Sequence, residues 1–269
     1  MVFDTGDNPT HVHVGQRRSG EVIARIDAAR DSEAALHHLR FILAVDDDTS
    51  PFAAAVAGDA LLGTRVATAR GVRPLRTATV SHAVLQAFAG QLITAREAKL
   101  IERRALTRIG RTHRGLMLPP RQDDLRSLTV ADWVACGLSP KRASALGRLV
   151  RHVDLEALRN ESADGLRGRL LRERMVGPWS AGVVALHGAG RYDIGLVGDL
   201  NLIRLSANLL DRPATEADSA ELLGRYDPWA GLASSHLMAH PLARERRHRR
   251  ADGRPPRATP DGRMRTARG

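Results

Sequence analysis

The sequence contains a single cysteine, Cys136, and few aromatic residues. One cysteine excludes an intrachain disulfide framework, and it also excludes a four-cysteine site for zinc or for an iron–sulfur cluster. Aromatic residues make up only 3% of the chain, so its core must consist mainly of Leu, Val, Ile and Ala. No apolar run approaches the roughly 20 residues of a transmembrane helix, and the first residues lack the basic and apolar blocks of a signal peptide. We therefore expect a soluble cytoplasmic protein without membrane contact.

Lysine is scarce as well, because Lys99 and Lys141 are the only two in the sequence. The net charge is nevertheless +11, since the sequence has 41 Lys and Arg residues and only 30 Asp and Glu residues. Such an excess favours a polyanionic partner, of which nucleic acid is the commonest, although arginine can also simply be the preferred surface cation. Residues 243–269 are rich in Arg, Pro and Gly and almost free of large apolar residues. We expect this tail to be disordered, with arginines available to phosphates.

Between the ends of the chain, helix start signals recur at short intervals. Thr94 with Glu97 and Thr129 with Asp132 have the spacing of capping boxes, and Ser139 before Pro140 is a typical N-cap. Few runs resemble strands, so we predict an all-α domain over residues 36–242. We expect residues 1–35 to be weakly ordered, with a strand that passes into a helix at 21–30.

Motifs for other kinds of site are missing. The histidines at 11, 13, 37, 38 and 82 have no cysteine partners and no metal-ligand spacing, so we interpret them as surface residues. Gly188 to Gly190 follow a predicted helix rather than a strand, which favours a helix C-cap over a dinucleotide loop. No phosphate-binding loop of the Walker type is present. We expect no cofactor and no metal.

The stretch "MVGPWSAGVVALHGAG", which starts at Met175, predicts a helix, a tight turn and a second helix, at about 166–187 in all. Gly177 permits either an unusual backbone shape or a close approach, and Pro178 suits the first position of a helix. The free N–H groups at such a helix start can bind a phosphate. Many helical hairpins carry a glycine of this kind, so an ordinary turn remains the alternative.

Asp199 and Trp179 each allow two interpretations. Asp199 precedes "LNLIRLSANLL" at the position of an N-cap, which is the simpler role. A helix N-terminus also favours a charged carboxylate, and a reaction that passes through a cationic sugar would use one. Trp179 is either a core residue that packs the hairpin or an aromatic surface on which a base can stack.

A resemblance to a family bears on these alternatives. The segment "LRERMVGPWSAGVVALHGAGRYDIGLVGDLNLIRLSANLL" resembles the helix-hairpin-helix and Gly/Pro…Asp signature of DNA glycosylases (HhH-GPD), and most of all the 3-methyladenine DNA glycosylase II branch. The similarity extends to "VLQAFAGQLITAREAKL", "GLSPKRASAL" and "YDPWAGLASSHL", in the family's order and spacing. It implies an all-α, two-lobed fold with DNA across the cleft, and at most a remnant of the family's N-terminal β-rich domain.

The resemblance also implies roles for individual residues. Asp199 matches the catalytic aspartate, and Trp179 stands where bifunctional members have lysine and the alkyl-base branch has tryptophan. Trp179 and three residues at positions that are aromatic in other members would form the base pocket: Val183, Leu200 and Met238. Gln91 and Leu92 match minor-groove residues, Leu92 as the wedge that replaces a flipped nucleotide. The hairpin would bind DNA through Met175, Val176, Gly177 and Ser180, where Met175 replaces the family's first glycine.

The function that follows from the resemblance is that of a monofunctional DNA glycosylase. It would flip out alkylated purines of the 3-methyladenine type and hydrolyse the N-glycosidic bond in base excision repair. We expect a monomer, located at the nucleoid, whose partner is double-stranded DNA with damaged bases. Two alternatives stay open: a glycosylase for a different damaged base, and a non-catalytic helix-hairpin-helix DNA-binding protein.

Overall fold

The computed structural model describes residues 1–27, 31–69 and 71–239. The chain begins with a three-stranded antiparallel sheet formed by β1 (Val2–Thr5), β2 (Asn8–Gln16) and β3 (Val22–Asp27), in the order β1-β2-β3. We expected residues 1–35 to be weakly ordered, with at most a remnant of a β-rich domain; the structure has a three-stranded sheet there, and β3 lies within the strand expected at 21–30. The predicted tail at 243–269 lies outside the described residues.

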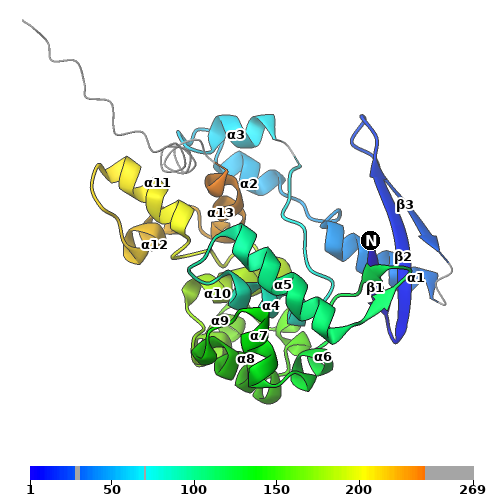
Figure 1. Cartoon of the computed structure of the whole chain (residues 1–269). Helices are drawn as coiled ribbons and strands as arrows, with labels where there is room; N and C mark the ends of the chain where they lie inside the picture. The colour runs from blue at the N-terminus through cyan, green and yellow to red at the C-terminus, as the bar shows by residue number, and fades with distance from the viewer. Residues whose placement is uncertain (28–30, 70, 240–269) are drawn as a thin grey trace, which may run out of the picture.

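The sheet is ordered because one of its faces is covered by the first helix, α1 (Ser32–Leu43). Phe3 and Val12 are buried against Leu39, in a small core of their own. This burial needs only alternate residues of β2, since Val12 points inward while its neighbours His11 and His13 point to the opposite face. Figure 1 shows the sheet and α1 at one side of the molecule, beside the helical part.

The rest of the described chain is almost entirely helical. Its elements are α2 (Ser50–Ala55), α3 (Gly63–Thr68), α4 (Val80–Gly90), α5 (Ala95–Ile109), the short strands β4 (Thr112–His113) and β5 (Leu116–Met117), α6 (Gln122–Ser127), α7 (Val130–Cys136), α8 (Pro140–His152), the 3₁₀ helix η1 (Glu156–Asn160), α9 (Ala163–Leu171), α10 (Pro178–Val183), the π-helical segment η2 (Val184–Ala189), α11 (Leu200–Leu210), α12 (Glu216–Gly224) and α13 (Ala230–Met238). No helix within the described residues is both long enough and apolar enough to span a membrane.

The predicted start signals are confirmed. The Thr94 and Thr129 hydroxyls accept hydrogen bonds from the backbone N–H groups of Glu97 and Asp132. The carboxylates of Glu97 and Asp132 in turn accept a hydrogen bond from the backbone N–H of each threonine. Ser139 caps α8 by accepting a hydrogen bond from the backbone N–H of Arg142, without a bond in return. These bonds satisfy N–H groups that have no partner within the helix, which is why the short helices begin at these residues.

The helices form two lobes that share one hydrophobic core. Figure 1 shows α4 to α10 on one side, while α2, α3 and α11 to α13 lie together on the other. Phe52 of α2 contacts the ring of Trp229, with centroids 6.2 Å apart, and Tyr226 donates a hydrogen bond to Asp59 at 3.0 Å. These contacts join segments of the second lobe that are far apart in the sequence.

Gly182 allows the loop before α11 to lie directly on α10, and Gly195 allows the same loop to lie against α12 and α13. A Cβ added at Gly182, near the end of α10, would overlap the backbone oxygen of Gly195. A Cβ at Gly195 would lie 2.8 Å from Leu223 Cδ1. The loop therefore passes in backbone contact with α10, and this contact sets the position of the residues at the start of α11.

We predict that Gly182→Ala destabilises the protein by about 1–3 kcal/mol, the range for overpacking a tight contact. Alanine favours the helix, but its methyl group would overlap a backbone atom that has no freedom to move aside. Gly168→Ala is the matched control, because a Cβ at Gly168 in α9 meets no atom within 4 Å. The control should gain up to about 1 kcal/mol from helix propensity. Urea unfolding measures both, and equal stabilities for the two variants would contradict the close contact.

Candidate active site

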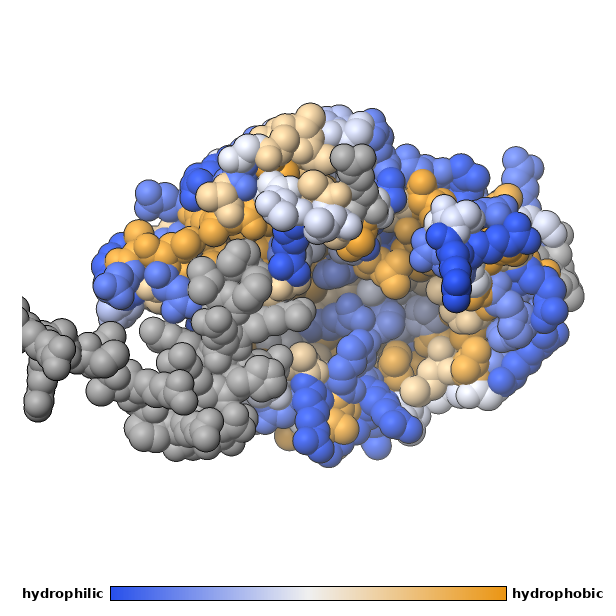
Figure 2. Space-filling view, turned by 90° about the horizontal axis from the view of Figure 1, so that it is seen from above, coloured by the Kyte–Doolittle hydropathy of each residue, from blue (hydrophilic) through white to orange (hydrophobic). Residues whose placement is uncertain are grey.

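A cleft of about 950 Å³ lies between the two lobes, and the predicted site residues converge on it. The helical hairpin, the end of α4 and the start of α11 supply most of its wall. The cleft is lined by every residue that the resemblance selected: Gln91, Leu92, Met175, Val176, Gly177, Trp179, Ser180, Val183, Asp199, Leu200 and Met238. Seen from above, the molecule presents small hydrophobic patches separated by hydrophilic residues (Figure 2).

Both carboxylate oxygens of Asp199 accept hydrogen bonds. Its Oδ1 accepts a hydrogen bond from the backbone N–H of Asn201 at 2.7 Å and so caps α11. Its Oδ2 accepts a bond from the indole Nε1 of Trp179 at 3.1 Å. Both oxygens are therefore held by the protein, and the carboxylate is fixed at the wall of the cleft.

Trp179 combines packing with exposure to the cleft. The indole packs against Gly90 at the end of α4, where an added Cβ would lie 2.8 Å from its Cη2 atom. One side of the ring is thus supported by backbone, while the residue lines the cleft and contacts the core only in part. This support and the bond to Asp199 restrict the ring to one orientation.

In the turn of the hairpin, the strained backbone conformation is at Met175 and not at Gly177. Gly177 has a φ of −98°, which any residue can adopt, whereas Met175 has a φ of +65°, in the region that favours glycine. A Cβ at Gly177 would meet no atom within 4 Å. Neither the backbone shape nor the packing of this chain requires a glycine at 177, and DNA contact at this residue stays a prediction.

Gln91 supports the hairpin from inside. Its Nε2 donates to the carbonyl oxygen of Met175 at 2.7 Å and to Ser180 Oγ at 3.0 Å. Gln91, Val176 and Ser180 are all buried. The Gln91 amide therefore bonds within the protein, and its contact with the minor groove stays a prediction. For Val176 and Ser180, DNA contact stays a prediction that concerns their backbone groups.

Leu92 has the opposite character. It is 84% exposed, more than any other large hydrophobic residue among those described, and its φ is +57°. The turn between α4 and α5 therefore presents an apolar side chain to water in a backbone conformation that costs about 1–2 kcal/mol. The role of Leu92 as a wedge stays a prediction.

The remaining pocket residues differ in exposure. Val183 is buried in α10, Leu200 is 43% exposed at the start of α11, and Met238 is partly buried in α13. The cleft also includes residues that the sequence did not single out, notably Asn201 and Arg204 on α11. Helical periodicity could have found them, since both lie within about one and a half turns of Asp199.

At one end of the cleft, a buried carboxylate joins α4 to α5. Glu102 accepts hydrogen bonds from His82 at 2.7 Å, Gln86 at 2.9 Å and Lys99 at 3.1 Å. Burial opposes its ionisation, but the bonds from His82 and Gln86 outweigh that effect and lower the pKa of Glu102 from 4.5 to about 2. The group is therefore a charged anchor between the two helices.

The histidines give a second correction. His11 and His13, interpreted as scattered surface residues, lie next to each other on β2 and face Asp27 of β3. The sequence separates the two histidines from Asp27 by more than ten residues, so only strand pairing reveals the group. It belongs to the sheet and is not part of the cleft lining.

We predict that Glu102 makes the stability of the protein sensitive to acid. Because the folded-state pKa is depressed, the ionised group contributes stability above pH 4.5, and this contribution is lost as the pH falls from 4.5 towards 2. The full loss is of the order of 3 kcal/mol. Glu102→Gln should lose most of this pH dependence, whereas Glu33→Gln, at an exposed position, should retain it. Urea unfolding between pH 7 and 3 measures the difference, and parallel profiles for Glu102→Gln and wild type would contradict the prediction.

Comparison with curated proteins identifies relatives that act on DNA. No protein-family model matches the chain. A Mycobacterium tuberculosis protein described as a probable bifunctional transcriptional activator/DNA repair enzyme AlkA is 28% identical over 225 residues. The match covers 81% of this chain and 45% of the relative. The chain thus spans less than half the length of the curated relative that it matches.

Solved structures resemble the chain more completely. A 3-methyladenine DNA-glycosylase from Archaeoglobus fulgidus superposes with a TM-score of 0.76 at 18% identity, over 88% of this chain and 84% of that one. An 8-oxoguanine glycosylase/lyase from Clostridium acetobutylicum, in complex with double-stranded DNA, gives a TM-score of 0.67 at 17% identity, over 92% and 83%. The chain therefore has the two-lobed helical fold of the helix-hairpin-helix DNA glycosylases, as its resemblance to the 3-methyladenine DNA glycosylase II branch predicted.

Proposed function

We propose that this chain is a monofunctional DNA glycosylase that removes alkylated purines of the 3-methyladenine type in base excision repair. The observation that carries the proposal is the Asp199 carboxylate, held at the cleft wall by the N-terminus of α11 and by the Trp179 indole. The similarity to an AlkA-type repair enzyme and to a 3-methyladenine DNA-glycosylase supports it. One chain contributes all of these groups, so a monomer suffices.

Two features favour double-stranded DNA as the partner. The net charge of the whole chain, +11, favours a polyanion, and the open space beside Gly177 leaves room for a phosphate at the hairpin. Leu92 lines the same cleft and points an apolar side chain into solvent. A target base must leave the duplex before it can be attacked, at a cost of a few kcal/mol that is least for damaged bases. Leu92 would fill the space that the base vacates.

The chemistry requires little beyond Asp199. An N3- or N7-alkylated purine is positively charged, so it leaves as a neutral base without help from a general acid. The sugar then develops positive charge, which a fixed carboxylate stabilises by electrostatics. The same carboxylate can orient the attacking water. Trp179 would stack on the cationic base, an interaction of about 0.5–2 kcal/mol.

Lyase chemistry does not fit the residues of the cleft. It requires an amine nucleophile next to the catalytic carboxylate, and the residue bonded to Asp199 is a tryptophan. The lysine that lines the cleft, Lys99, donates to Glu102 at 3.1 Å. Cleavage of the glycosidic bond by water is therefore the reaction that the site supports.

A glycosylase for a different damaged base is the second candidate. It is favoured by the aliphatic Val183, Leu200 and Met238 in the pocket and by the similarity to an 8-oxoguanine glycosylase/lyase. A non-catalytic DNA-binding protein is the third, and the strained Met175 in the hairpin favours it. The next experiment separates all three.

We predict that Asp199→Asn lowers base release from methylated duplex DNA by about 10²–10³-fold or more, as expected for loss of a preorganised charge. Asparagine caps helices about as well as aspartate, so folding stability should change by less than about 1 kcal/mol. Affinity for an abasic-site duplex should stay equal or increase, since one anion near the phosphates is removed. Chromatography of the released bases identifies the product.

Asp154→Asn is the matched control, because Asp154 also accepts a hydrogen bond from a backbone N–H, that of Ala157, and does not line the cleft. Its release rate should equal that of the wild type. Near-wild-type release by Asp199→Asn would refute the catalytic assignment. Release of 8-oxoguanine in place of methylated bases would favour the second candidate, and DNA binding without release by the wild type would favour the third.

We predict that Leu92→Ala weakens binding to an abasic-site duplex by at most about 1.5–3 kcal/mol, the value of burying one leucine side chain. Its folding stability should change by less than about 0.5 kcal/mol, because the side chain is exposed. Leu75→Ala removes another exposed leucine, 61% accessible and outside the cleft lining, and should leave binding unchanged. Equal binding by both variants in a fluorescence anisotropy titration would exclude the wedge.

A further inference from the structure

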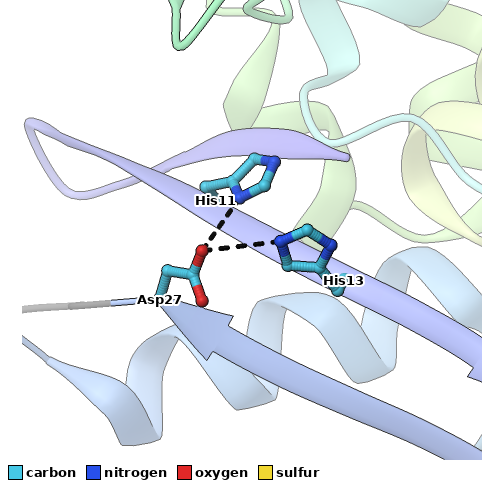
Figure 3. A group of neighbouring side chains, drawn as sticks. All are labelled: His11, His13 and Asp27. Atoms are coloured by element: carbon cyan, nitrogen blue, oxygen red, sulfur yellow. Dashed lines mark hydrogen bonds and ion pairs between the residues drawn. The ribbon is translucent and has the colours of Figure 1, made fainter.

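The outer face of the N-terminal sheet carries a group of side chains that the glycosylase proposal does not use. His11 and His13 are two residues apart on β2 and therefore project from the same face of the strand. Asp27 of β3 is directly opposite His11 in the strand register. Figure 3 shows both imidazole rings turned towards the Asp27 carboxylate.

The distances within this group match those around a metal ion. Asp27 Oδ2 lies 3.1 Å from His11 Nδ1 and 3.5 Å from His13 Nε2, and one ligand atom from each residue lies within 4.8 Å of the others. Ligands about 2.1 Å from a tetrahedral zinc ion are about 3.4 Å from each other. The two distances to Asp27 bracket this separation, and the third, between the two histidine nitrogens, is at most 4.8 Å and would have to fit the ion by side-chain rotation.

We propose that His11, His13 and Asp27 bind a divalent transition-metal ion, with zinc the best fit. Two imidazoles and one carboxylate suit zinc, whereas calcium and magnesium prefer oxygen ligands alone. Three protein ligands leave one tetrahedral position for water. The ion would link β2 to β3 on the face opposite the core formed with α1.

The charges around Asp27 show how binding takes place. Arg25 Nε lies 3.2 Å from Oδ1 and orients the carboxylate without occupying the oxygen that faces the histidines. Arg114 Nη1, from the turn between β4 and β5, lies 2.9 Å from Oδ2 and competes with the metal for that oxygen. The Arg114 side chain is 52% exposed, so breaking this ion pair costs little free energy. Metal binding therefore displaces Arg114 from Asp27.

A titration of the full chain, without an affinity tag and after treatment with a chelator, tests the proposal. Zinc binding is followed by calorimetry, and cobalt, used as a spectroscopic substitute, is followed by its visible absorption. We expect one ion per chain at this site, with the intense visible bands of four-coordinate cobalt. His13→Ala should weaken binding at least tenfold and abolish those bands, and its fold should persist because the His13 side chain is 54% exposed.

Two further variants separate this site from incidental binding. Arg114→Gln should tighten zinc binding several-fold, because it removes the competing cation. His37→Ala removes an exposed histidine of α1 and should change nothing. No saturable zinc binding, binding that persists in the His11→Ala/His13→Ala double variant, or weaker binding by Arg114→Gln would each overturn the proposal. These outcomes are independent of base release, so they do not depend on the glycosylase function.

Discussion

The hydrogen bond from the Trp179 indole to Asp199 is the interaction around which the candidate site is organised. Asp199 begins α11 and Trp179 lies in the first turn of α10, so the bond joins the two elements that face the cleft. The bond can form because Gly182 lets the intervening loop lie against the backbone of α10, while Gly195 lets that loop pack against Leu223 and Ala230. The N-cap of α11 alone would fix the position of Asp199. The contact between the loop and α10 is what brings its second carboxylate oxygen to the Trp179 indole.

The hairpin beside the site is supported in a similar way. Gln91, at the end of α4, bonds to the Met175 carbonyl and the Ser180 hydroxyl, so α4 holds both sides of the turn. The next residue, Leu92, lies in a left-handed conformation and points outward. In this turn the buried side chain of Gln91 is followed directly by the exposed side chain of Leu92. The position of Leu92 relative to the hairpin therefore depends on the hydrogen bonds of Gln91.

Two kinds of feature could be predicted from the sequence: helix caps, which depend on residues close together in the chain, and the cleft residues, which depend on a resemblance over several motifs in a fixed order. The caps at Thr94 and Ser139 require only side chains three or fewer residues from the N–H groups that they satisfy, and they were confirmed. The residues of the cleft came from the resemblance, which reflects a shared arrangement of helices. The N-cap role of Asp199 was local, whereas its bond to Trp179 across twenty residues was not.

Features that depend on contacts distant in sequence were not predicted. Only the strand at 22–27 was expected from the residues of the sheet, and β1 and β2 were not, because the sheet packs on α1 through residues distant in sequence. The meeting of His11 with Asp27 depends on the strand register, and the buried bonds of Gln91 depend on the path of the hairpin. A pattern of residue types contains no information on such pairings until the topology is known.

The proposed substrate preference follows from charge. The site offers a fixed carboxylate for the sugar and an indole for a cationic base, and the residue bonded to that carboxylate is an indole rather than an amine. A positively charged purine needs no more, whereas a neutral oxidised purine would need assistance in leaving.

The most direct test is base release under single-turnover conditions from two otherwise identical duplexes, one methylated and one containing 8-oxoguanine. The account predicts release of free methylated purines with an uncleaved abasic strand and no release of 8-oxoguanine. Release of 8-oxoguanine with strand cleavage, and none from the methylated duplex, would contradict it.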